Sequence, residues 1–303
     1  MTLKNWDFSS FDGVNLKIHE MGEGKDGQHP VILLHGLFSN AHTNWIKFGH
    51  AQLLADAGFR VIMPDLRAHG DSAAPHDPAA YPDDVLVKDI EALIAHLQLS
   101  DYVLGGFSLG ARTTARLLVT GAKPGKAILA GMGLEGLAGW QRRQQFFQEA
   151  IRLKDSARRG DPHWLAIQFM KSQKVDPVGA SCLLRTFSDL EPEALAVIDT
   201  PTLVLCGSED RDNGDPVKLA GLLSGGRHVA IPGTHMSSVT KAELGQEMLR
   251  FLRHHRRTAD LAASEIARAQ ETRPAVRAVI FPLWLVRLCR NPLPAGPARP
   301  RTG

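Results

Sequence analysis

Tyr102-Val-Leu-Gly-Gly-Phe-Ser-Leu-Gly-Ala111 is the stretch that decides the fold of this 303-residue chain. A short apolar run of strand length leads into Gly106-Phe-Ser-Leu-Gly110, and an amphipathic helical pattern starts directly after it. Glycines two positions on either side of a serine let a strand and a helix approach each other around a sharp, strained turn. The turn leaves Ser108 at a helix N-terminus, where backbone N–H groups favour negative charge, so we predict that Ser108 is a nucleophile.

Strand-like and helix-like patterns alternate on both sides of this turn. Runs that are apolar on both faces, as buried parallel strands require, are residues 30–34, 60–63, 102–104, 127–130, 202–205 and 228–231. Amphipathic helical patterns separate them, near residues 45–57, 83–97, 109–120, 215–223 and 240–256. Two alternating stretches, 7–11 and 15–21, predict an opening hairpin. The order predicts an α/β fold with a doubly wound, mostly parallel sheet that binds ligands at the carboxyl ends of its strands.

The alternation is interrupted once, between Gly131 and Thr200, where helical patterns occur without a strand. A structureless loop of that length would be unusual in a compact domain. We therefore predict a helical cap over residues 134–197, inserted after the sixth strand as a lid on a core formed by residues 1–133 and 198–256. Large apolar side chains are expected to form the interior of this cap rather than to line a pocket; they are Trp140, Phe146, Phe147, Trp164, Phe169 and Met170.

Composition places the chain among ordinary globular proteins, with 44% hydrophobic and 22% charged residues and a formal net charge of +3. The charge is uneven, because residues 251–303 carry ten arginines against three acidic residues. A nucleic-acid-binding domain would carry basic and aromatic residues throughout a binding face, so no nucleic-acid partner is expected. Three cysteines without C-x-x-C spacing favour neither a disulfide framework nor a thiolate zinc site, and we expect a reducing, cytoplasmic location.

Residues 257–303 are predicted to be a basic C-terminal extension whose end is disordered. Within it, residues 274–290 combine an apolar stripe with neighbouring arginines, and two interpretations stay open. The segment packs on the protein's own surface or on a second subunit, or it makes a peripheral contact with anionic lipid. The longest apolar run here, residues 278–289, is far shorter than the ~20 residues that span a bilayer, so no transmembrane helix is expected.

A serine hydroxyl is a weak nucleophile unless a base takes its proton and a third group orients that base. His235 lies in the loop after the last predicted strand and is the expected base, whereas His228 lies inside that strand and is the poorer choice. The orienting acid is expected in a loop after a strand, and three carboxylates meet this condition: Glu135, Glu209 and Asp210.

These residues resemble the α/β-hydrolase superfamily, in which nucleophile, acid and histidine follow one another in this order along the chain. The resemblance covers residues from Trp6 to His255. It rests on the Ser108 turn and on four other motifs: His35-Gly36, Asp65-Leu-Arg-Ala-His-Gly-Asp-Ser72, Gly207-Ser-Glu-Asp210 and Pro232-Gly-Thr-His235. It implies that Asp210 is the acid, with Glu209 as the alternative, and that the cap occupies the place where the family inserts one.

The resemblance also implies an oxyanion hole, formed by the backbone N–H groups of Leu37 and Leu109. Two other features of the motifs are interpreted as scaffold. His35 is expected to brace its loop through hydrogen bonds of its ring. Arg67 and Asp71 are expected to pair and so to hold the loop that contains them.

Serine at the nucleophile position narrows the reaction class. Similar chains that displace halide or open epoxides need a carboxylate there, whereas Ser108 favours attack on a carbonyl carbon and an acyl-enzyme. We expect a serine hydrolase that cleaves an ester, lactone or thioester of a small to medium apolar substrate, with no metal or cofactor implied. Carbon–carbon bond hydrolysis and a cofactor-free perhydrolase or haloperoxidase reaction stay open, because the same three residues serve them. A non-catalytic binding protein would be expected to lack at least one of the three.

Overall fold

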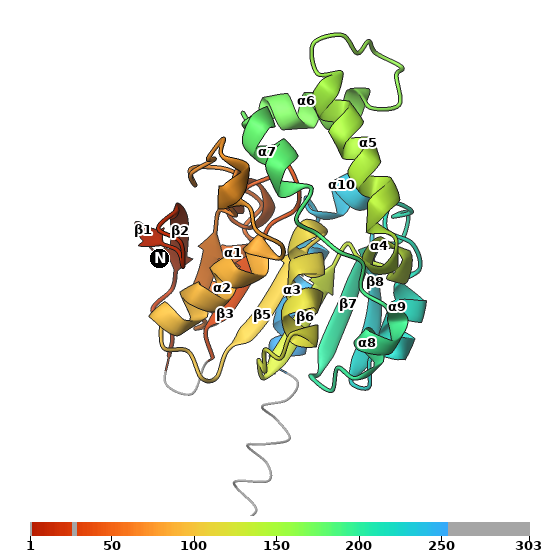
Figure 1. The fold of residues 1–303 in the computed structure, drawn as a ribbon. Coiled ribbons are helices and arrows are strands. Elements are labelled where there is room, and N and C mark those ends of the chain that lie inside the picture. Colours follow the sequence, from red (N-terminus) through yellow and green to blue (C-terminus); the bar gives the residue numbers. More distant parts are fainter. Residues whose placement is uncertain (1, 26–28, 254–303) are drawn as a thin grey trace, which may run out of the picture. The chain divides into compact units, whose positions relative to one another are not determined.

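The computed structural model describes residues 2–25 and 29–253, whose fold is shown in Figure 1. Within these residues eight strands form one sheet. The strands are β1 (Leu3–Ser9), β2 (Asn15–Met21), β3 (Val31–Leu34), β4 (Val61–Pro64), β5 (Val103–Phe107), β6 (Lys126–Ala130), β7 (Thr202–Gly207) and β8 (Gly226–Ile231). The antiparallel pair β1–β2 is the predicted hairpin, and the six predicted buried strands all occur close to their expected positions.

The strand order is β1-β2-β4-β3-β5-β6-β7-β8, with β2 antiparallel to both neighbours and the strands from β4 to β8 parallel. From β3 the chain continues to β4 on one side and later returns to β5 on the other. In a doubly wound sheet this reversal leaves a crevice at the carboxyl ends of the two strands. The predicted sheet is thereby confirmed, and the loops after β3 and β5 are placed side by side at the crevice.

Helices cover both faces of the sheet, because its parallel strands are apolar on both faces. One face packs against α1 (His50–Asp56) and the helical residues 242–253. The other face packs against helices that include α2 (Val85–His96), α3 (Leu109–Val119) and α9 (Pro216–Leu222). Along β3 the side chains alternate between these two layers, Val31 and Leu33 facing the first and Ile32 and Leu34 the second. The helix expected from residue 45 is divided, because His42–Ile46 form a π-helical turn before α1.

The segment between β6 and β7, which the structure describes throughout, is helical. Its helices are α4 (Leu134–Ala138), α5 (Trp140–Arg152), α6 (Trp164–Ser172), α7 (Pro177–Leu183) and α8 (Pro192–Ala196). Figure 1 shows α5, α6 and α7 beyond the carboxyl ends of the parallel strands. Met170 of α6 and Ala180 of α7 pack on Phe38, which follows β3. Leu195 of α8 packs instead in the layer of α3 and α9.

The predicted basic extension, residues 257–303, and its apolar segment 274–290 lie outside the described residues. The described chain ends in the helical residues 242–253, whose Leu244 and Met248 are buried against the sheet. Among the helices described up to that point, none has both the length and the apolar character that crossing a membrane would require.

Candidate active site

Ser108 lies between the last residue of β5 and the first residue of α3, at φ 52° and ψ −108°. The glycines around it are needed because backbone atoms surround them. A Cβ on Gly106 would come within 2.2 Å of the Gly110 carbonyl carbon, and a Cβ on Gly110 within 2.1 Å of the Leu34 carbonyl oxygen. The Ser108 backbone N–H donates to the Ala130 carbonyl oxygen of β6 at 2.8 Å. The sheet therefore holds this serine in a conformation that L-residues rarely adopt.

His235 is the first residue of the short helix α10 (His235–Ser238), directly after the loop that leaves β8. Thr234 caps this helix, because its Oγ1 accepts from the Ser237 N–H while its own N–H donates to Ser237 Oγ at 2.8 Å. The capped turn carries the imidazole to Ser108, with 3.1 Å between His235 Nε2 and Ser108 Oγ. The Phe107 ring lies 5.0 Å from the imidazole, centroid to centroid, and packs beside it.

Asp210 follows the end of β7 and is buried, with its Oδ2 2.8 Å from His235 Nδ1. Since an ionised carboxylate only accepts, Nδ1 carries the proton and Nε2 is left to accept from the Ser108 hydroxyl. Asp210 Oδ1 accepts from the Asp212 N–H at 3.0 Å. Burial raises the pKa of the Asp210 carboxyl, but the His235 hydrogen bond and charge, the Asp212 N–H and the Arg143 charge together bring it below its ordinary value. The carboxylate is therefore kept ionised beside the imidazole.

The other candidate residues lie elsewhere. Glu209 is exposed, one residue before Asp210. Glu135 lies on α4, where its Oε2 accepts from the Asp215 N–H at 2.7 Å and its Oε1 is 3.7 Å from Lys218 Nζ. The buried Nε2 of His228, within β8, has no hydrogen-bond partner among the described residues. The structure thus brings Ser108 together with Asp210 and His235 alone among the residues proposed from the sequence for these roles.

Leu37 and Leu109 lie at the same crevice, after β3 and β5. Leu109 is the first residue of α3, where a backbone N–H has no intrahelical acceptor. The turn that contains Leu37 is held on both sides, because the Gly36 N–H donates to Asn44 Oδ1 at 3.1 Å and the Phe38 N–H donates to His69 Nε2 at 3.0 Å. Both leucines line one pocket together with Ser108.

Two buried histidines brace these loops as neutral rings. His35 donates from Nδ1 to the Gly36 carbonyl oxygen at 2.8 Å and accepts at Nε2 from the Leu66 N–H at 2.9 Å. His69 donates from Nδ1 to the Arg67 carbonyl oxygen at 3.0 Å while Nε2 accepts from Phe38. Burial lowers the pKa of both, for His69 to about 3. A neutral ring can donate at one nitrogen and accept at the other, which is what each of these positions uses.

The predicted pair between Arg67 and Asp71 is wrong. The fully buried Arg67 guanidinium instead binds Asp89 at 2.7 and 3.1 Å and Asp12 at 2.7 and 2.8 Å. Asp71 stabilises the loop through its backbone instead, because its N–H donates to Asp65 Oδ2 at 2.9 Å. The reason is non-local, since the hairpin turn and α2 bring two carboxylates to Arg67 that are distant in sequence.

The pocket at Ser108 is narrow, with a cavity volume of about 20 Å³, and α5 forms one of its walls. Its lining residues are Leu37, Ser108, Leu109, Arg112, Met132, Gly136, Trp140, Arg143, Phe147 and Asn213. The expectation that the cap aromatics form only cap interior is therefore wrong for Trp140 and Phe147, because α5 runs across the strand ends and turns these side chains toward the crevice. Met170 is buried, in a cluster with Phe38 and Ala180, whereas Phe146 is exposed, so the expectation is wrong for Phe146 as well.

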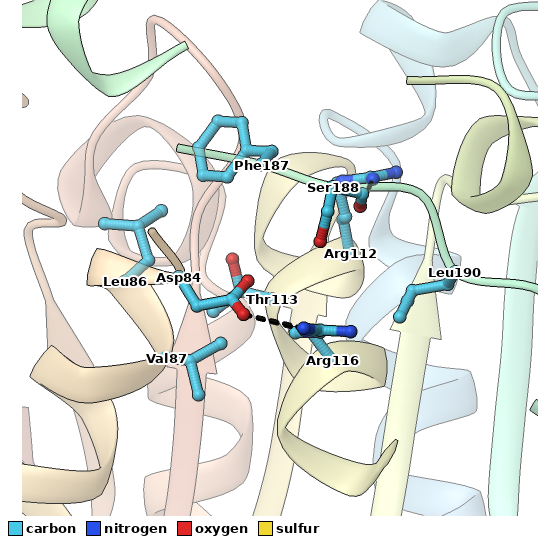
Figure 2. Close-up of a pocket in the computed structure, with 9 residues that line it drawn as sticks. All are labelled: Asp84, Leu86, Val87, Arg112, Thr113, Arg116, Phe187, Ser188 and Leu190. Carbon is cyan, nitrogen blue, oxygen red and sulfur yellow. Dashed lines mark hydrogen bonds and ion pairs between the residues drawn. The ribbon is translucent and has the colours of Figure 1, made fainter. Parts of the chain in front are cut away.

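A second pocket lies on the α2 side of α3 and is shown in Figure 2. Arg112 lines both pockets, and the ion pair between Arg116 Nη2 and Asp84 Oδ2, at 2.7 Å, lies in the second one. Its apolar lining comes from Leu86 and Val87 of α2 and from Phe187 and Leu190, which follow the α5–α7 helices.

In the part of the chain that the structure describes, two groups of side chains place three ligand-type atoms within 4.8 Å of one another: His19, Asp65 and Asp71, and Asp210, Asp212 and His235. In each group a histidine already binds a carboxylate, His19 Nε2 to Asp65 Oδ2 at 3.1 Å and His235 Nδ1 to Asp210 Oδ2. A metal ion at either place would have to replace this hydrogen bond.

Comparison with known proteins identifies the family. Residues 29–165 match the family model described as alpha/beta hydrolase fold. The AB hydrolase superfamily protein YisY of Bacillus subtilis (strain 168) is 30% identical over 223 residues, which are 65% of this chain and 79% of that protein. An epoxide hydrolase of Caballeronia sordidicola is 33% identical over 109 residues, 36% of this chain and 31% of that protein. The solved structure of an esterase from Exiguobacterium antarcticum superposes with a TM-score of 0.67 at 19% identity, over 82% of this chain and 100% of that one. The chain therefore belongs to the α/β-hydrolase superfamily.

Proposed function

We propose that this protein is a serine hydrolase that cleaves a carboxylic ester, a lactone or a thioester through Ser108, His235 and Asp210. The observation that carries the proposal is the continuous hydrogen-bonded chain from Ser108 Oγ to His235 Nε2, 3.1 Å, and from His235 Nδ1 to Asp210 Oδ2, 2.8 Å. This is the arrangement in which a serine hydroxyl becomes a nucleophile.

In the proposed reaction His235 Nε2 takes the Ser108 proton while Oγ attacks the substrate carbonyl carbon. Asp210 stabilises the imidazolium that forms. The backbone N–H groups of Leu37 and Leu109 donate to the developing oxyanion. His235 then gives its proton to the leaving group, and an acyl-enzyme remains on Ser108. Water, deprotonated by His235, then attacks the acyl carbon, and His235 returns the proton to Ser108 Oγ as the acid is released.

Serine at this position supports acyl transfer over epoxide opening, although epoxide hydrolases are among the relatives. An alkyl-enzyme ester needs a carboxylate nucleophile, and Ser108 has none. Residues 134–197 are proposed to act as a cap over a core formed by residues 1–133 and 198–256. Trp140 and Phe147 of α5, beside Leu37 and Met132, offer an apolar surface to the substrate.

Two measurements test the proposal. A fluorophosphonate probe should label the wild-type protein at Ser108, and a panel of p-nitrophenyl esters of increasing chain length, with a lactone and an acyl thioester, should identify the substrate class. Ser108→Ala should lower kcat by ~10⁴–10⁶ on the best ester, because members of such a triad act as a unit. Circular dichroism checks that the variant is folded. A folded Ser108→Ala protein with near wild-type turnover, or a wild-type protein that does not label, would refute the assignment.

A further inference from the structure

The ionisable side chains that line the pocket at Ser108 are both arginines, Arg112 and Arg143. The other lining residues are mostly apolar, and the one amide among them, Asn213, donates from Nδ2 to the Gly131 carbonyl oxygen at 2.7 Å. A guanidinium cannot lose its charge at ordinary pH and presents five donors in a planar fork. The charged part of the pocket lining is therefore entirely positive.

Arg112 is engaged by the protein itself. Its Nη1 donates to the carbonyl oxygens of Gly136 and Leu137 at 2.9 and 3.0 Å, and its Nη2 donates to that of Ser188. The guanidinium also lies 5.0 Å from the centre of the Trp140 ring. Figure 2 shows Arg112 beside Ser188 at the chain that leads back from the cap helices. Arg112 lies on α3, one turn after Ser108. Its hydrogen bonds to residues 136, 137 and 188 attach both the start and the end of the helical segment between β6 and β7 to α3.

Arg143 differs from Arg112 in having most of its donors unused. It lies on α5, 5.6 Å from the centre of the Phe147 ring, and its Nη1 donates to the Asp212 carbonyl oxygen. Within residues 2–25 and 29–253 this is its only hydrogen bond or ion pair. Burial lowers the pKa of Arg143, although Asp212 and Asp210 oppose this at longer range. A partly buried cation without a paired anion is costly, and an anionic ligand would relieve that cost.

We propose that the pocket is built for an ester that carries an ionised carboxylate, and that Arg143 binds this carboxylate with its fork of free donors. The inference rests on the proposed function and names the substrate class of the same site. The apolar residues around Ser108 contact the chain between the ester and the carboxylate, and Arg143 marks the end of that chain. A bidentate arginine–carboxylate pair supplies both direction and affinity, which an apolar wall alone lacks.

The test compares substrates that differ in one group. On the acyl side the pair is mono-4-nitrophenyl adipate and 4-nitrophenyl hexanoate, which differ by a terminal carboxylate in place of a methyl group. On the alcohol side the pair is 4-carboxyphenyl butyrate and 4-methylphenyl butyrate. For the wild-type protein kcat/KM should favour the anionic member of at least one pair, and that pair shows which side of the ester faces Arg143. Equal or lower kcat/KM for the anionic member of both pairs would overturn the proposal.

The variants use the neighbouring arginine as control. Arg143→Gln should lower the anionic-to-neutral ratio of kcat/KM by about 10- to 100-fold, mainly through KM, because a hydrogen-bonded charge is lost from the ground state and the transition state alike. Arg143→Lys keeps the charge without the planar fork, so its anionic-to-neutral ratio of kcat/KM should lie between those of the wild type and Arg143→Gln. Arg142→Gln, which changes an exposed side chain one residue away, should leave the ratio unchanged. If Arg143→Gln and Arg142→Gln give the same ratio, Arg143 serves only to balance Asp210 and Asp212, and the proposal is wrong.

The two proposals fail differently. A wild-type protein without Ser108-dependent turnover of the neutral esters would refute the proposed function. A wild-type protein that turns over 4-nitrophenyl hexanoate through Ser108, but shows no preference for the anionic members, keeps its function and refutes only the role of Arg143. Melting temperatures of the variants exclude misfolding as the cause of a changed ratio.

Discussion

At the scale of single residues, Asp210 and Glu209 are adjacent acids with opposite surroundings. Asp210 is buried against His235 Nδ1, whereas Glu209 is exposed. Asp210→Asn should lower kcat by ~10⁴, because an amide neither holds the imidazole in the required tautomer nor stabilises the imidazolium. Glu209→Gln should stay within about twofold of wild type, as expected for a surface change away from special features. Steady-state kinetics on the best neutral ester decides between them, and an inactive Glu209→Gln with an active Asp210→Asn would reverse the assignment.

At the scale of elements, Arg67 joins the β1–β2 turn to α2 through two carboxylates of different exposure. The Asp89 side chain is 1% exposed and that of Asp12 is 25% exposed. Asp89 also accepts from Ser10 Oγ, so its removal leaves this buried hydroxyl unpaired and leaves Asp12 as the remaining carboxylate partner of Arg67. The hairpin is thus attached to the core by a charge network rather than by apolar contact alone.

Removing either carboxylate should destabilise the protein by different amounts. Asp89→Ala should lower the free energy of unfolding by about 3–5 kcal/mol, because the buried Arg67 charge is left without its innermost partner. Asp12→Ala should cost about 1 kcal/mol, since Asp89 remains and water reaches the exposed side of the pair. Urea unfolding measures both. Equal losses would mean that the two carboxylates share the Arg67 charge evenly.

At the scale of the whole molecule, buried histidines with a lowered pKa contribute to how stability responds to acid. Burial lowers the pKa of His35, His50 and His69 from the ordinary 6.5, for His69 to about 3. The unfolded chain binds protons at these positions below pH 6.5 while the folded chain does not, so stability is lost as the pH falls through 6.5 and continues to fall toward the folded pKa. Each histidine contributes at most about 1.4 kcal/mol per pH unit.

Urea unfolding between pH 7.5 and 5 emphasises this contribution, because the carboxyls with lowered pKa, Asp65 and Asp210 among them, lose stability mainly below pH 5. The raised pKa of Asp89 acts in the opposite direction, so the fall that is measured is the net of the two. The free energy of unfolding should fall across this range. His69→Gln keeps an acceptor for the Phe38 N–H but cannot take up a proton, so its slope should be smaller than that of wild type. An unchanged slope in His69→Gln, or stability that rises toward pH 5, would contradict the assignment of neutral buried rings.

The sequence by itself determined the features that depend on local pattern. Runs apolar on both faces favour strands covered on both sides, and a serine between glycines after such a run favours a tight strand-to-helix turn. Ser108 and His235 could be identified for the same reason, because each follows a strand and parallel strands bring their carboxyl ends to one edge of a sheet. Strand position left Glu135, Glu209 and Asp210 open as the acid, and only the family resemblance favoured Asp210. The structure places the side chains of Ser108, His235 and Asp210 within hydrogen-bond distance.

Only the tertiary structure decided which distant residues meet. Arg67 pairs with Asp12, 55 residues away in sequence, because the sheet brings the hairpin turn to it. The sequence around Arg67 does not predict this partner. Arg143 likewise lines the pocket at Ser108 because α5 crosses the strand ends. The sequence of α5 alone does not tell whether Arg143 faces the pocket or the solvent. Local pattern determines which elements form. The packing of those elements determines which charges are left buried, and so what the pocket can bind.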